Sequence, residues 1–139
     1  MNKITTIYIS ETDRERLNNL IQLSRREGPS HSAYIKTLEE GIEFAEVVSP
    51  QDIPSNVVTM RSKVKLRDLD TKEESVYTIV FPTEADIDQG QVSILAPLAT
   101  ALLGRRLGDT VEFQAPSRLR RLKVEKILYQ PESAGDYGL

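Results

Sequence analysis

One segment, residues 91–109 with the sequence QVSILAPLATALLGRRLGD, restricts the possible folds more than any other. A strand-like run at 92–95 is followed by Pro97, which suits the first turn of a helix because its missing N–H costs no hydrogen bond there. Gly104 ends this helix, and Gly108 begins the next strand. The helix therefore needs a sheet or a partner against its apolar side, which is predicted to contain Leu98, Ala101 and Leu102.

Composition limits the functional classes. The chain has 139 residues, a net charge of −3, no cysteine and one histidine. Disulfides and thiolate sites are excluded, and we expect no metal and no cofactor. The negative charge disfavours nucleic-acid binding that depends on overall positive charge and favours a protein partner. We expect a cytoplasmic protein without membrane contact, because the N-terminus is too polar for a secretory signal and no apolar run approaches ~18 residues.

The first part of the chain predicts a helix at 12–27. Ser10 and Thr12 offer N-caps, with Asp13 and Glu15 three residues beyond them in the manner of a capping box. Residues 5–9 precede this helix as a short strand or an extended lead-in. The helix is amphipathic, with an apolar face formed by Leu17, Leu20 and Ile21.

A second helix is predicted after the break at Gly28 and Pro29. Ser30 or Ser32 caps it, and Ser49 before Pro50 ends it, because a residue that precedes proline is pushed out of the helical region. The two helices are expected to form an antiparallel hairpin as an N-terminal unit, residues 1–49. The apolar stripe of the second helix is Tyr34, Ile35, Leu38, Ile42 and Ala45.

From Val57 the apolar period changes from helical to two. Alternation over 57–67 predicts a half-buried strand with a basic outer face, followed by a turn at 68–71. Further strands are expected at 75–81, 110–114 and 119–129, whereas the tail after 129 lacks periodicity. The fold class predicted is α+β: a helical hairpin and then, in residues 50–139, a mostly antiparallel sheet with one short helix on it.

This order of elements resembles the C-terminal domain of the Gre-type transcript cleavage factors of bacteria. The stretch NVVTMRSKV at 56–64 and the tail YQPESAGDY at 129–137 are similar to the regulator of nucleoside diphosphate kinase group within that family. The resemblance implies a domain that is like the FK506-binding proteins in fold, lacks their activity, and docks on RNA polymerase near the rim of the secondary channel. The docking candidates that it implies are Ser93, Ala96, Pro97, Leu98, Ala101, Leu102, Arg105 and Arg106. Two positions depart from the Gre pattern, Ala96 for serine and Thr100 for arginine.

The tip of the hairpin differs from that of cleavage-stimulating Gre factors. Their tips resemble Arg-Glu-x-Gly-Asp-x-Ser-Glu-Asn, in which acidic residues help to hold magnesium. Here the tip residues are Glu27, Gly28, Pro29, Ser30 and His31, and the acids after the glycine are absent. Because magnesium prefers carboxylate oxygens, this tip predicts no assisted RNA cleavage. At about sixteen residues per helix, or roughly 24 Å, the hairpin is also shorter than the family's cleavage arms. We therefore expect a monomeric, non-catalytic protein that binds polymerase and competes with Gre factors.

The sequence is also compatible with other functions. The fold analogy suggests a peptidyl-prolyl isomerase, although such a site normally needs an aromatic-rich pocket. The family name suggests control of nucleoside diphosphate kinase, either directly or through transcription. Arg105 and Arg106 satisfy carbonyls at the helix end or pair with a partner.

A basic sheet face for RNA is a further alternative. It would contain Arg61, Lys63, Lys65, Arg67, Arg118, Arg120, Arg121, Lys123 and Lys126. Interspersed acids and the lack of aromatic residues between the cations count against it. No sequence-specific contact with nucleic acid is expected.

Overall fold

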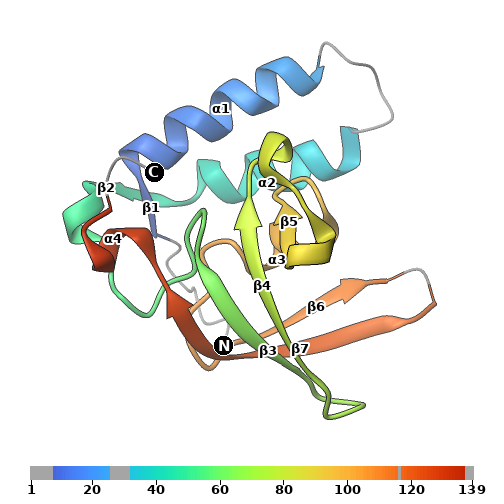
Figure 1. The fold of residues 1–139 in the computed structure, drawn as a ribbon. Helices are drawn as coiled ribbons and strands as arrows, with labels where there is room; N and C mark the ends of the chain where they lie inside the picture. Colours follow the sequence, from blue (N-terminus) through green and yellow to red (C-terminus); the bar gives the residue numbers. More distant parts are fainter. Residues whose placement is uncertain (1–7, 26–31, 116, 137–139) are drawn as a thin grey trace, which may run out of the picture.

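The computed structural model describes residues 8–25, 32–115 and 117–136 and has the α+β architecture expected (Figure 1). Two helices, α1 (Glu11–Arg25) and α2 (Ser32–Glu43), lie together at one end of a five-stranded sheet. Its strand order is β5-β4-β3-β7-β6. No helix in the described ranges is long and apolar enough to cross a membrane. The strands are β3 (Lys63–Asp68), β4 (Glu74–Val80), β5 (Gln91–Ser93), β6 (Thr110–Gln114) and β7 (Leu119–Tyr129).

The first helix begins where the capping pattern predicts. The Ser10 hydroxyl accepts a hydrogen bond from the Asp13 backbone N–H at 3.0 Å, which satisfies one of the free donors of the first turn. Leu17 and Ile21 are buried on the inner face of α1, and Leu38 and Ile42 are buried on α2. Packing of two apolar stripes thus holds the helices together.

The predicted end of the second helix is wrong. The helix ends at Glu43, and residues 46–48 form a short strand, β2 (Glu46–Val48). This strand pairs in parallel with β1 (Tyr8–Ser10), with Ile9 opposite Val47. The ladder between these distant segments ends the helix before Ser49 and Pro50 are reached, and tertiary pairing thus overrides the local stop signal.

The strand expected from Val57 begins later, at Lys63. Arg61 has a positive φ of 65°, which bends the chain away from an extended path. The turn is closed by Thr59, whose N–H donates to the Ser62 hydroxyl at 2.9 Å, while the Ser62 N–H donates to the Thr59 carbonyl at 3.0 Å. The residues before the turn are buried, but as an irregular segment and not as a strand.

The sheet is antiparallel except where β5 joins β4 in parallel, and its last two strands have the predicted bounds. In β3 the side chains of Val64 and Leu66 point inward and are at most 1 % exposed. Short 3₁₀ turns at Pro50–Asp52, Pro82–Glu84 and Ile87–Gln89 connect the elements. The helix α3 (Pro97–Leu102) covers the inner face of the sheet.

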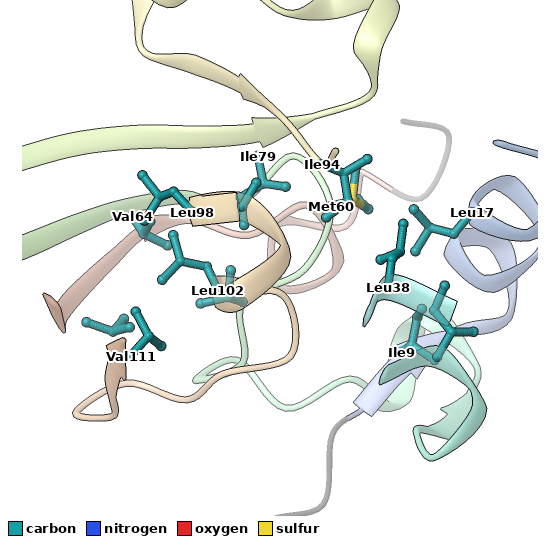
Figure 2. Packing of buried hydrophobic residues seen from close by; sticks show 14 of the residues in the cluster. Ile9, Leu17, Leu38, Met60, Val64, Ile79, Ile94, Leu98, Leu102 and Val111 are labelled. Atoms are coloured by element: carbon teal, nitrogen blue, oxygen red, sulfur yellow. The ribbon is translucent and has the colours of Figure 1, made fainter. Parts of the chain in front are cut away.

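One buried cluster runs through both parts of the chain (Figure 2). Leu98 and Leu102 of α3 lie with Val64 and Val111 at one end of the view, and Leu17 with its neighbours lies at the other. Met60 and Ile94 lie between the two groups. The helical pair is therefore packed on the sheet domain through a shared core.

The tail after β7 is ordered, although its sequence lacks periodicity. It forms one helical turn, α4 (Pro131–Ala134), which is capped by Gln130 and closed by Gly135 at a positive φ of 80°. The buried Gln130 amide donates to the carbonyls of Pro54 and Val57 at 2.8 and 2.7 Å. The tail thus satisfies backbone acceptors in the segment that connects the helices to the sheet.

Candidate functional site

The first candidate site is the surface around α3. Before the helix, Ser93 ends β5 and its hydroxyl accepts the Leu95 N–H at 3.1 Å. Pro97 occupies the first turn, as expected, and Ala96 provides no side-chain cap. Thr100 donates its hydroxyl to the Ile94 carbonyl at 2.6 Å, so it ties the helix to the strand that precedes it. These contacts fix the position of α3 relative to β5.

The predicted docking residues divide between the surface and the core. The side chains of Leu98 and Leu102 face inward, with 9 % and 0 % exposed. They are positioned to hold α3 on the sheet and are not accessible to a partner, which corrects their assignment to a contact surface. The half-buried members of the set, which remain accessible, are Ser93, Ala96, Pro97, Ala101, Arg105 and Arg106.

The two arginines after Gly104 have different surroundings. Gly104 has a φ of 81°, which ends the helix as predicted. The Arg105 Nε donates to the Ala101 carbonyl at 3.2 Å, so this arginine does satisfy a free acceptor at the helix end. The Arg106 guanidinium lies 5.6 Å from the centre of the Tyr8 ring, in a cation–π contact. Arg106 thereby connects the α3 region to β1.

A cleft of about 300 Å³ lies beside this surface, between α2, α3 and β6. Gly41 leaves space there, because a Cβ at that position would meet nothing within 4 Å. Its lining includes one aromatic residue, Tyr8, and is otherwise mainly aliphatic, as is unusual for a prolyl isomerase pocket. The sequence did not indicate this cleft because its walls come from segments far apart in the chain.

The second candidate is a polar junction between α1, the turn at 59–62 and α4. Asp13 is 5 % exposed. Burial raises the pKa of its carboxyl to about 7, and the charge of Glu132 adds to the rise. Arg16, Arg61 and the Met60 N–H act in the opposite direction. Thr59 donates its hydroxyl to Glu132 at 2.6 Å, which brings this second carboxyl into the junction. Sequence reasoning assigned Asp13 to the capping box alone, since nothing local indicates the approach of α4.

Arg61 completes the junction on its outer side. Its guanidinium forms a two-pronged ion pair with Glu84, at 3.0 to 3.2 Å, and lies over the Phe81 ring. Within the described ranges, no three His, Cys, Asp or Glu residues are placed to hold a metal ion. The predicted hairpin tip, residues 27–31, lies outside the described residues.

Comparison with known proteins decides the family. A model described as the C-terminal domain of transcription elongation factor GreA/GreB matches residues 53–129, more than half of the chain. The chain belongs to this family. It is 37% identical over 135 residues to the regulator of nucleoside diphosphate kinase of Escherichia coli K12, an alignment that covers 95% of this chain and 96% of that protein.

Other members of the family align less completely. The transcription elongation factor GreA of Sinorhizobium medicae is 41% identical over 100 residues, which cover 71% of this chain and 63% of that protein. Among solved structures, a GreA/GreB transcription elongation factor from Nitrosomonas europaea has a TM-score of 0.75 and 37% identity, covering 91% of this chain and all of that one. These relatives are named as regulators or transcription factors and not as catalysts. The match to the solved structure from Nitrosomonas europaea confirms the predicted fold class.

Proposed function

We propose that this protein is a non-catalytic transcription regulator that binds RNA polymerase through its sheet domain, near the rim of the secondary channel. Membership of the GreA/GreB family is the observation that carries the proposal. In this proposal, the accessible residues around α3 contact the polymerase, and the helical pair partly occludes the channel. The protein would then compete with Gre factors for the same position.

The absence of cleavage activity is proposed from the helices. At about 1.5 Å per residue, the 15 residues of α1 span roughly 22 Å. The matched GreA of Sinorhizobium medicae has more than a third of its length outside the alignment, whereas the regulator from Escherichia coli aligns almost completely. The sequence of the tip also lacks the acids that hold magnesium in cleavage factors.

The decisive experiment is a binding measurement of this protein on core RNA polymerase, with a long-hairpin Gre factor as competitor. We expect saturable binding that the Gre factor displaces, and no stimulation of RNA cleavage in backtracked complexes. Absence of binding would refute the docking proposal. Stimulated cleavage would refute the non-catalytic part alone.

A surface variant tests the docking residues. Ala101→Glu places a charge on the accessible side of α3, and Pro97→Glu puts an acid in its first turn, where the helix dipole tolerates it. We expect at least a tenfold loss of polymerase affinity from the pair together. Gln114→Glu, which is exposed on β6, is the matched control. Equal polymerase affinity of the unmodified protein, the double variant and the control would show that α3 lies outside the interface.

The name of the relative from Escherichia coli favours a second candidate, regulation of nucleoside diphosphate kinase by direct contact. Titration of the purified kinase with this protein distinguishes the two. A change in kinase activity without polymerase present supports direct contact, whereas an unchanged activity leaves control through transcription.

A further inference from the structure

The outer face of the sheet concentrates positive charge. Five cations lie on the adjacent strands β3 and β7, which are hydrogen-bonded to each other. Four of them alternate with inward-facing residues such as Val64 and Val124, both 0 % exposed, and so lie on the opposite, solvent-facing side. The fifth, Lys126, is on the same side because the register places it opposite Lys65. We call this set the basic face: Lys63, Lys65, Arg67, Lys123 and Lys126.

The register places like charges directly opposite one another. Lys65 is paired with Lys126, and Arg67 with Lys123. Such pairs destabilise a sheet, because the side chains of opposed residues are close. The register also shifts between Lys65 and Leu66, where Glu125 is the extra residue of β7. The arrangement therefore costs stability that a bound anion would recover.

The described ion pairs neutralise only part of the basic face. Lys65 lies 3.1 Å from Glu74, and Arg67 lies 3.5 Å from Glu125. In the parts of the chain that the structure describes, Lys63, Lys123 and Lys126 have no carboxylate within ion-pair distance. These three lysines are exposed and available to an external anion.

The remaining cations of the sheet region are engaged elsewhere. The nearly buried Asp68 accepts from Arg118 at 2.7 Å and from Arg120 at 3.2 Å, and Asp70 accepts from Arg121 at 2.8 Å. The Arg118 guanidinium holds the pKa of the Asp68 carboxyl well below its usual range. Arg118, Arg120 and Arg121 therefore fasten the β3–β4 turn to β7, and we do not count them in the basic face.

We infer that the basic face binds the phosphate backbone of a nucleic-acid duplex, without reading its sequence. Lys63, Lys65 and Arg67 lie two apart along β3, so each is separated from the next by about 6.7 Å, similar to the distance between successive phosphates along a nucleic-acid strand. Lys65 and Arg67 also pair with carboxylates of the sheet, so the three lysines without such a partner supply most of the net positive charge. The aromatic side chain beside the face, Tyr129 opposite Lys63, is half-buried and donates its hydroxyl to Asp136, and no aromatic side chain is paired with Lys65, Arg67, Lys123 or Lys126, which favours a duplex over a single strand. Because the whole chain has a net charge of −3, it repels nucleic acid elsewhere, and binding is confined to the basic face. The inference does not depend on polymerase binding.

Fluorescence anisotropy with the protein alone tests the inference, using a labelled DNA duplex and an RNA–DNA hybrid of the same sequence. With three lysines on phosphates, the slope of log affinity against log salt is expected to be about −2.7, a loss of roughly 40-fold between 50 and 200 mM salt. Whichever of the two, the DNA duplex or the RNA–DNA hybrid, binds more tightly is the preferred ligand. Absence of binding to both at 50 mM salt would overturn the inference.

A triple variant, Lys63→Gln, Lys123→Gln and Lys126→Gln, should lower the affinity at least tenfold and flatten the salt dependence. The matched control removes three exposed cations elsewhere, through Arg14→Gln, Lys36→Gln and Lys72→Gln. We expect it to bind within about twofold of the unmodified protein. Equal losses in both variants would mean that net charge alone governs binding and would overturn the inference. Displacement of the duplex by polyglutamate at matched charge would instead identify an acidic protein surface as the ligand.

Discussion

At the scale of single residues, Asp13 shows how a capping position can acquire a second role. Its backbone N–H completes the predicted N-cap, while its side chain is buried against the turn at 59–62. A carboxyl in this position is costly when ionised, because burial removes water and Glu132 adds a like charge. The residue type was predictable as part of a cap, but its environment depends on α4, which is more than a hundred positions away.

Asp13 should make stability depend on pH. The pKa of its carboxyl is raised from 3.8 to about 7 on folding, so the folded state binds more protons than the unfolded state between these values. Stability is therefore expected to fall as pH rises from 4 to 7, by an amount of the order of 4 kcal/mol, and then to level off. Urea unfolding at several pH values measures this. Asp13→Asn should remove this component, while Asp52→Asn, at an exposed position, should leave it unchanged.

A second prediction at this scale concerns two glycines with similar backbone angles. Gly90 and Gly135 have φ of 70° and 80°, but only at Gly90 would a Cβ meet backbone, at 2.9 Å from the Val76 carbonyl oxygen. Gly135→Ala should cost about 1 to 2 kcal/mol for the left-handed conformation alone. Gly90→Ala should cost more, because the β4–β5 connection must also shift. Thermal or urea unfolding compares them, and equal losses would contradict the steric argument.

At the scale of elements, the sequence predicted the regular segments and missed the irregular ones. The strands Thr110–Gln114 and Leu119–Tyr129, the proline at the start of α3 and the serine cap of α1 were all predicted, because their signals are local. The strand Glu46–Val48 was missed because three residues are too few for a period, and its partner is β1. The positive φ of Arg61 had no signal either, since turns of this kind usually contain glycine.

The same division applies to the candidate sites. The α3 segment was found from its proline, its apolar spacing and Gly104. The sequence did not show that Leu98 is buried whereas its neighbour Pro97 is accessible, because this difference depends on packing against the sheet. The polar junction was missed altogether, because its members come from three separate elements. For the basic face, charge alternation was visible, but the ion pairs that remove Arg118 from it depend on the turn at Asp68.

The tail is an element with a testable structural role. Gln130 is 2 % exposed and donates to two carbonyls, so Gln130→Leu would remove the side-chain donor of the buried Val57 carbonyl and leave the Pro54 carbonyl with the Val57 N–H alone. We expect a loss of about 2 to 4 kcal/mol in the free energy of unfolding. Ser133→Ala, on the exposed side of α4, is the control and should cost less than 1 kcal/mol. A loss for Gln130→Leu no larger than that of the control would show that the tail is dispensable for stability.

At the scale of the whole molecule, the shared core joins the helical pair to the sheet. Because Met60 and Ile94 lie between the two groups of buried side chains, neither part buries its apolar surface alone (Figure 2). We therefore expect one cooperative unfolding transition for the 139-residue chain. Far-ultraviolet circular dichroism and tyrosine fluorescence should give the same urea midpoint. Two separate midpoints would instead support the helical hairpin, residues 1–49, as an independent domain.

The bonds of Gln130 also bear on how the chain is made. The amide that satisfies the Val57 carbonyl is 73 residues further along the chain. At 5 to 20 residues per second, a ribosome needs about 4 to 15 s to synthesise that distance. During this interval the Val57 carbonyl of the connecting segment can bond only to water, and the helices have been synthesised before the tail that packs beside them. The nascent protein therefore passes through a stage that a chaperone could recognise, and it ends when Gln130 leaves the exit tunnel.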